Sequence, residues 1–148
     1  MSVYYLSIGS NIEPEKYIPA CLKKLSAVWP QARFSTVYET DPVGPAGRSK
    51  FWNLAARIQS YETESQMRTA LREIEAGLGR VRIPNERFAP RTIDIDILPQ
   101  AGYQTQAFIM IPLAEIAPAD LDLETGLNFE TLANRVREQA EGFKAVRF

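Results

Sequence analysis

The stretch Arg91-Thr-Ile-Asp94-Ile-Asp96-Ile-Leu98 alternates apolar and polar side chains. This period of two predicts a β-strand in which the isoleucines face the core and the two aspartates face the opposite side. In such a strand the Cα atoms of Asp94 and Asp96 lie roughly 6.5–7 Å apart. Two carboxylates at that spacing repel one another, so either a divalent cation or partner arginines must offset the repulsion. The strand alone leaves both readings open.

The rest of the chain alternates between strand and helix patterns. We expect strands over Val3–Ile8, Phe34–Tyr38, Phe51–Ile58 and Ile93–Leu98, and helices over Glu15–Trp29 and from a capping box at Thr63–Gln66 to Gly77. This β-α-β-β-α-β order predicts an α+β, ferredoxin-like fold, an antiparallel sheet with helices on one face. Beyond this core, Phe108–Ile111 is expected to be extended, and a C-terminal helix is expected over Phe129–Ala140.

Length and composition narrow the class of protein. The chain has 148 residues, 45% of them hydrophobic, which suits one globular domain over residues 1–148, expected to be a monomer. A net charge of -1 and a pI of about 5.6 argue against a nucleic-acid partner. There is no signal-peptide pattern and no apolar run near the ~20 residues of a membrane span. We therefore expect a cytoplasmic protein without a membrane partner.

Histidine is absent and Cys21 is the only cysteine. Their scarcity excludes histidine-based triads, histidine general bases, and zinc sites built from histidine or thiolate ligands. Any bound metal must therefore be held by oxygen, which favours magnesium, calcium or manganese.

The segment before the aspartate strand carries Arg80, Arg82, Arg87 and Arg91. Guanidinium groups match phosphate oxygens in geometry, so this cluster indicates a polyphosphate site next to the two aspartates. The alternative is a solvated basic loop that pairs with nearby acidic residues. Neither a Walker A motif nor a Gly-x-Gly-x-x-Gly motif is present.

Several motifs together resemble the 6-hydroxymethyl-7,8-dihydropterin pyrophosphokinase family of folate biosynthesis. They cover most of the chain to about residue 118, in the family's order: Ser7-Ile-Gly-Ser-Asn11, Tyr38-Glu-Thr40-Asp-Pro42-Val43-Gly44, Phe51-Trp-Asn53-Leu-Ala-Ala56, Gly79-Arg80-Val-Arg82, Arg87-Phe88-Ala-Pro90-Arg91-Thr-Ile-Asp94-Ile-Asp96-Ile97 and Phe108-Ile-Met-Ile-Pro-Leu-Ala-Glu-Ile-Ala-Pro118. The string Pro-Arg-Thr-Ile-Asp-Ile-Asp is specific in this context.

The resemblance implies an enzyme that transfers pyrophosphate from ATP to a reduced pterin and releases AMP. Asp94 and Asp96 would hold two magnesium ions on ATP. The pterin site would be formed by Thr40, Pro42, Val43, Asn53 and Phe108, with Trp52 or Phe51 close by. ATP would be bound by Glu75, Arg80, Arg82, Arg87, Phe88 and Arg91, of which Arg80, Arg82 and Arg91 would stabilise charge during transfer. The segments 41–50 and 80–91 would close over the substrates.

The chain departs from the family pattern between the aspartate strand and Phe108. The family has a longer segment with a Pro-His pair and then a basic residue, whereas nine residues, Pro99–Ala107, join Leu98 to Phe108 here. Gln106 stands near the usual arginine, Phe88 replaces a common tryptophan, and Ala89 a common glycine. Because the missing groups help to hold ATP, the alternative function is a pterin-binding protein that has lost or altered ATP-dependent kinase activity.

Overall fold

The computed structural model describes residues 1–40, 51–80 and 92–148. The elements in chain order are β1 (Ser2–Ser10), α1 (Pro14–Val28), β2 (Arg33–Phe34), β3 (Val37–Thr40), β4 (Phe51–Ser60), α2 (Glu64–Gly77), β5 (Asp94–Leu98), the 3-10 helix η1 (Tyr103–Thr105), α3 (Ala107–Ile116), α4 (Phe129–Arg135), the 3-10 helix η2 (Arg137–Ala140) and β6 (Lys144–Val146). The predicted β-α-β-β-α-β order is confirmed, except that the single strand predicted over Phe34–Tyr38 forms two short strands, β2 and β3. The predicted capping box at Thr63 and Gln66 starts α2.

Within the described residues, six strands form one sheet in the order β5-β1-β4-β3-β6, and β2 also pairs with β4. All the pairings are antiparallel. The long central strands β1 and β4 pair from Ser2–Ser60 to Ser10–Trp52. The α+β, ferredoxin-like fold class predicted from the sequence is confirmed.

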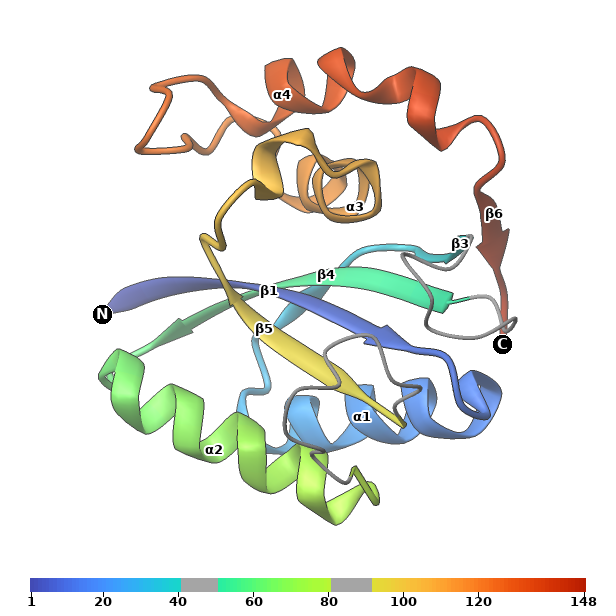
Figure 1. Ribbon diagram of the computed structural model, residues 1–148. Helices are drawn as coiled ribbons and strands as arrows, with labels where there is room; N and C mark the ends of the chain where they lie inside the picture. Colours follow the sequence, from blue (N-terminus) through green and yellow to red (C-terminus); the bar gives the residue numbers. More distant parts are fainter. Residues whose placement is uncertain (41–50, 81–91) are drawn as a thin grey trace.

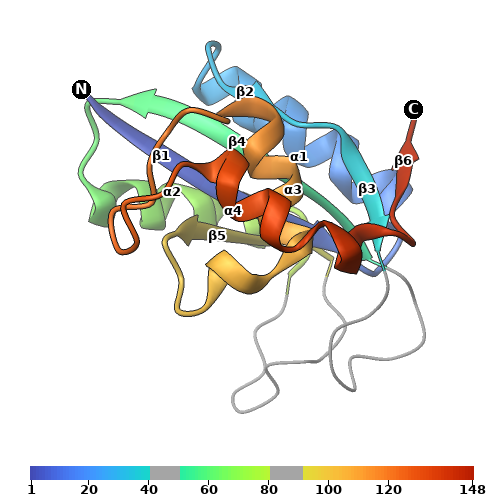
Figure 2. The same ribbon diagram turned by 90° about the horizontal axis from the view of Figure 1, so that it is seen from above.

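Helices cover both faces of the sheet (Figure 1). Side chains from β1, β4 and β5, including Leu6, Ile8 and Ile95, pack against α1 and α2 and form what we call the α1/α2 core. On the other face, Ala55 and Leu98 pack with α3 and α4 in the α3/α4 core. Figure 2 shows α3 and α4 lying across the strands. Helices on a single face were predicted, and the second helical layer is an addition to that arrangement.

The prediction of an extended segment at Phe108–Ile111 is wrong, because these residues lie inside helix α3. Ile109, Met110 and Leu113 are all buried, so the helix is apolar around most of its circumference. A helix of this kind lacks a polar stripe and its sequence resembles a buried strand. Glu115 fixes α3 to the sheet by accepting hydrogen bonds from the Tyr38 hydroxyl at 2.6 Å and the Thr36 amide at 2.5 Å.

No helix in the described part of the chain is both long and apolar enough to cross a membrane.

Candidate active site

The two aspartates of β5 lie on the face of the sheet that α3 and α4 cover. Ile95, between them, belongs to the α1/α2 core, and Leu98 belongs to the α3/α4 core. Because side chains alternate along a strand, Asp94 and Asp96 share the face of Leu98. The alternation predicted from the sequence is therefore confirmed.

Strand register connects these aspartates with a second polar residue. Gly9 on β1 pairs with Asp94 on one side and with Asn53 on the other. Directly paired residues in an antiparallel sheet point to the same face. Asp94, Gly9 and Asn53 therefore form a row across three neighbouring strands. With strands about 4.8 Å apart, the two ends of this row lie roughly 10 Å from each other.

Arg80 joins the end of α2 to the aspartate strand. Its Nη1 donates to Glu75 Oε2 and to Asp94 Oδ1, both at 2.6 Å, and to the Ile93 carbonyl at 3.2 Å. Burial alone would lower the pKa of the Arg80 guanidinium, but the carboxylates of Asp94 and Glu75 outweigh burial and raise it. This part of the predicted arginine cluster thus pairs with an acidic residue of the predicted metal site.

Glu75 lies beneath β5 with only 2% of its surface exposed. Its Oε2 accepts the Arg80 hydrogen bond and a second one, at 2.8 Å, from the backbone amide of Ile95, the residue between the two aspartates. We expected Glu75 to contact ATP. These contacts fix Arg80 and β5 in place, and a contact between Glu75 and ATP stays a prediction.

Asp96 is partly buried, and burial, followed by the neighbouring carboxylates of Asp94 and Glu75, raises its pKa. A cation beside this carboxylate would remove the repulsion. The described residues contain no group of three or more acidic, cysteine or histidine side chains able to hold a metal. Asp94 and Asp96 offer carboxylate oxygens, the ligand type of magnesium, which is commonly held by one or two carboxylates together with substrate phosphates and water.

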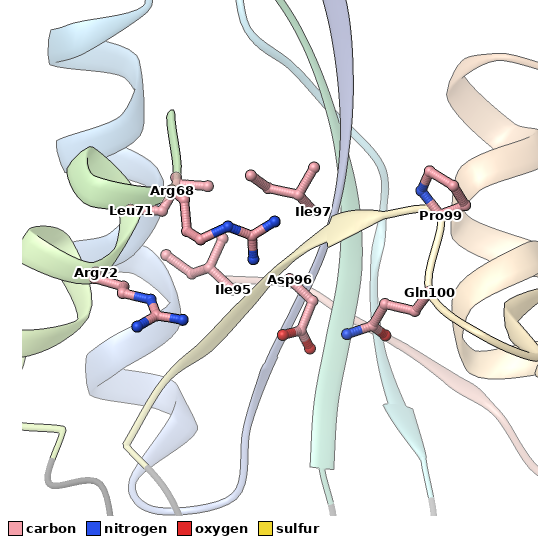
Figure 3. A pocket seen from close by; sticks show the side chains of 8 residues that line it. All are labelled: Arg68, Leu71, Arg72, Ile95, Asp96, Ile97, Pro99 and Gln100. Carbon is pink, nitrogen blue, oxygen red and sulfur yellow. The ribbon is translucent and has the colours of Figure 1, made fainter. Parts of the chain in front are cut away.

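A cavity of about 220 Å³ lies along the outer edge of β5, next to Asp96. Figure 3 shows that Asp96 and Gln100 point toward one another, while Arg68 and Arg72 reach from α2 toward the strand. The complete lining is Arg68, Leu71, Arg72, Ile95, Asp96, Ile97, Pro99 and Gln100. Its two guanidinium groups and one carboxylate suit a phosphate-bearing ligand with a bound cation.

At the other end of the row, Asn53 and Thr40 form a buried polar pair. Asn53 Nδ2 donates to Thr40 Oγ1 at 2.6 Å, and the two residues are 5% and 4% exposed. The remaining donor and acceptor capacity of the amide can recognise a heterocycle that offers complementary groups. Phe108, at the start of α3, packs against the α3/α4 core on this same face.

Trp52 lies on the opposite face. Its side chain packs against the α1/α2 core, stacks on Phe148 with ring centroids 6.2 Å apart, and donates from Nε1 to Glu39 at 3.4 Å. Of the two aromatic residues considered for the pterin site, Phe51 therefore shares the Asn53 face and Trp52 does not. The physical reason is strand alternation, which separates neighbouring residues of β4.

The remaining predicted site residues, Pro42, Val43, Arg82, Arg87, Phe88 and Arg91, lie outside the described residues, as do most of the two segments expected to close over substrates. The sequence reasoning missed Arg68, Arg72 and Gln100. The two arginines could have been found, because a spacing of four places them on one face of the predicted helix. No local pattern marks Gln100.

The comparisons with known proteins identify the family of the chain. Residues 5–118 match the family model of 7,8-dihydro-6-hydroxymethylpterin-pyrophosphokinase. A 2-amino-4-hydroxy-6-hydroxymethyldihydropteridine pyrophosphokinase of Pseudomonas aeruginosa is 35% identical over 146 residues, covering 86% of this chain and 88% of that protein. A protein with the same name from Methylorubrum extorquens is 36% identical, covering 80% of this chain and 84% of that protein. Another from Bacillus subtilis is 30% identical, covering 95% of this chain and 93% of that protein.

These matches, over most of the chain, place it in a class of pyrophosphokinase enzymes. The chain belongs to the 7,8-dihydro-6-hydroxymethylpterin-pyrophosphokinase family.

Proposed function

We propose that the chain transfers pyrophosphate from ATP to 6-hydroxymethyl-7,8-dihydropterin in folate biosynthesis and releases AMP. The observation that carries this proposal is the row Asp94–Gly9–Asn53, which brings a carboxylate that could bind a metal and an amide that could bind a heterocycle onto one face of the sheet. Family membership and the names of the relatives support the same reaction.

The pterin lies at the Asn53 end of the row. The Asn53 amide offers a donor and an acceptor to the pterin edge, and Thr40 holds that amide by their mutual hydrogen bond. Phe51 and Phe108 supply aromatic surface for the flat ring. Pro42 and Val43 complete the site by resemblance to the family.

ATP lies at the Asp94 end and in the adjoining cavity. Asp94 and Asp96 would hold the magnesium ions, which when bound neutralise phosphate charge. Arg68 and Arg72 line the cavity and donate to the nucleotide. Arg80, Arg82 and Arg91 stabilise the charge that spreads over the transferred group, and Arg87 and Phe88 contact ATP by resemblance.

The reaction joins the hydroxymethyl oxygen of the pterin to the β-phosphorus of ATP and breaks the bond between that phosphorus and the oxygen bridging it to the α-phosphorus. AMP leaves with this oxygen, and the hydroxyl proton passes to solvent. Such transfers require of the protein mainly alignment of the reactants and charge stabilisation. Asn53 and the aromatic side chains fix the pterin, and the arginines fix the phosphates.

Titration calorimetry with the pterin, in the presence and absence of magnesium and a non-hydrolysable ATP analogue, tests the proposal. We expect both ligands to bind. Asp96→Asn should weaken binding of the ATP analogue about tenfold or more, since a charged contact is worth about 1.5–3 kcal/mol. Glu130→Gln, an exposed carboxylate on α4, is the matched control and should leave binding unchanged. Pterin binding with no response to the magnesium–nucleotide complex would instead establish the pterin-binding protein.

A further inference from the structure

Gly9 occupies a position where glycine is unfavourable for the strand itself. It lies within β1, with β5 paired on one side and β4 on the other. A glycine there has no side chain to pack and weakens the strand, and often marks a close approach of another group. Positive φ does not explain it, because the described glycines with positive φ are Gly79, Gly102 and Gly126. The reason for glycine must therefore be space.

The space above Gly9 is taken by Asn53. A Cβ built on Gly9 would lie 2.8 Å from Asn53 Oδ1, and 3.7 Å from both Phe51 Cδ1 and the Trp52 carbonyl oxygen. The first separation is well inside van der Waals contact, whereas the other two are ordinary. The amide of Asn53 thus leans over β1 and uses the volume that any other residue at position 9 would fill.

Asn53 cannot readily yield that volume. It is 5% exposed, and its Nδ2 donates to Thr40 Oγ1 at 2.6 Å. Turning the amide away from a Cβ would lengthen or break this bond, and Thr40 is itself buried at 4% exposure. Moving β1 instead would disturb its pairing with both neighbouring strands.

We propose that Gly9 is a positioning residue for substrate recognition: its missing side chain lets the Asn53 amide take the orientation in which it reads the pterin edge. This inference rests on the proposed function, because it assumes that the pterin is the ligand of Asn53. Gly9 also lies between Asn53 and Asp94 in the row. Because it has no side chain, it leaves open the space above the sheet in which the pterin must face the phosphates.

A double-mutant cycle tests the proposal, using wild type, Gly9→Ala, Asn53→Ala and the double variant. Binding of 6-hydroxymethyl-7,8-dihydropterin is measured by calorimetry, and the unfolding temperature of each protein is measured without ligand. Gly142→Ala is the matched control, because an added Cβ there meets no atom within 4 Å.

We expect Gly9→Ala to raise the pterin Kd about tenfold, the size of one lost hydrogen bond in a desolvated site. In the Asn53→Ala background the same change should have no further effect on Kd, and the removal of Asn53 should also restore any loss of unfolding temperature. Equal losses from Gly9→Ala in both backgrounds would overturn the proposal, as would a wild-type Kd in Gly9→Ala.

The proposed function and the positioning role of Gly9 are contradicted by different results. If wild type does not bind the pterin, the proposed function is contradicted. The packing of Gly9 against Asn53 is then judged from the unfolding temperatures. It is supported if Asn53→Ala restores the unfolding temperature that Gly9→Ala lowers, and it is overturned if Asn53→Ala does not.

Discussion

Asp94 and Asp96 are neighbours on one strand but differ in their electrostatic surroundings. Arg80 donates to Asp94 at 2.6 Å, with 11% and 18% of the two side chains exposed. Asp96 is half-buried, and its pKa is raised by burial and by the adjacent carboxylates. Without a cation, Asp96 therefore opposes folding at neutral pH, whereas Asp94 favours it.

The two isosteric amide variants should then change stability in opposite directions. We expect Asp96→Asn to stabilise the ligand-free protein by about 0.5–2 kcal/mol, because it removes a repelling buried charge at a site kept for function. Asp94→Asn should destabilise it by about 1–3 kcal/mol, because Arg80 loses a charged partner. Urea unfolding at pH 7.5 measures both, and a shift of the same sign in the two variants would contradict the assigned roles.

Two roles can be distinguished for Glu75, which either positions β5 or contacts ATP. Glu75→Gln keeps an oxygen for the Ile95 amide but weakens the ion pair with Arg80, so we expect stability to fall by about 1–2 kcal/mol. In the proposed reaction kcat should fall with little change in the KM for ATP. Steady-state kinetics provide the readout, and Arg135→Gln on α4 serves as an unrelated charge control. A raised KM for ATP with unchanged kcat and stability would instead show that Glu75 contacts ATP.

Period-two alternation explains why some site residues could be located from the sequence and others could not. It correctly placed Asp94 and Asp96 opposite Ile95, because a strand fixes the face of every second residue. The same rule distinguishes Phe51 from Trp52 only once Asn53 is known to mark the site. The role of Gly9 depends on a contact between two strands about forty residues apart in sequence, which no local pattern reveals.

Among the elements, α3 shows where sequence patterns cannot decide between structures. Its run Ala107–Ile116 is nearly all apolar, and an apolar run without a polar stripe fits a buried strand as well as a buried helix. Packing settles the structure, because α3 lies between the sheet and α4 and needs no polar face. The capped helix α2 has clear periodicity and a capping box, and it was predicted from both.

The segment between α3 and α4 is organised by Asp122, which is 2% exposed. Its carboxylate accepts hydrogen bonds from the Tyr103 hydroxyl at 2.6 Å, the Thr125 hydroxyl at 2.6 Å and the Thr125 amide at 3.0 Å. Burial would raise the pKa of Asp122, but these hydrogen bonds outweigh burial and hold it below the usual 3.8.

A lowered folded-state pKa means that Asp122 stabilises the protein above the unfolded value of about 4, and that this stabilisation is lost as the pH falls through the folded value. We expect Asp122→Asn to lower the free energy of unfolding by about 1–3 kcal/mol at pH 7. The difference from wild type should shrink as the solution is made more acidic. Urea unfolding at several pH values measures this, with Glu130→Gln as control, and a difference independent of pH would contradict the role of the charge.

In the whole molecule, the two faces of the sheet differ in their contents. The α1/α2 face is filled mainly by apolar side chains, with Glu75 buried beneath β5. The other face combines the α3/α4 core with the row from Asp94 to Asn53. The fold class was predictable because each element of the β-α-β-β-α-β core carries a local signal. The full site was not, because it joins residues of four strands and two helices whose meeting depends on register.

The most direct measurement of the central claim is a transfer assay with ATP, magnesium and 6-hydroxymethyl-7,8-dihydropterin, with both products quantified by mass spectrometry. We predict equal amounts of AMP and pyrophosphorylated pterin from the wild type. The rate should fall at least about a hundredfold in Asp94→Asn and in Asp96→Asn, as for loss of a group that stabilises transition-state charge. No pterin product from wild type, or full rates in both variants, would contradict the claim.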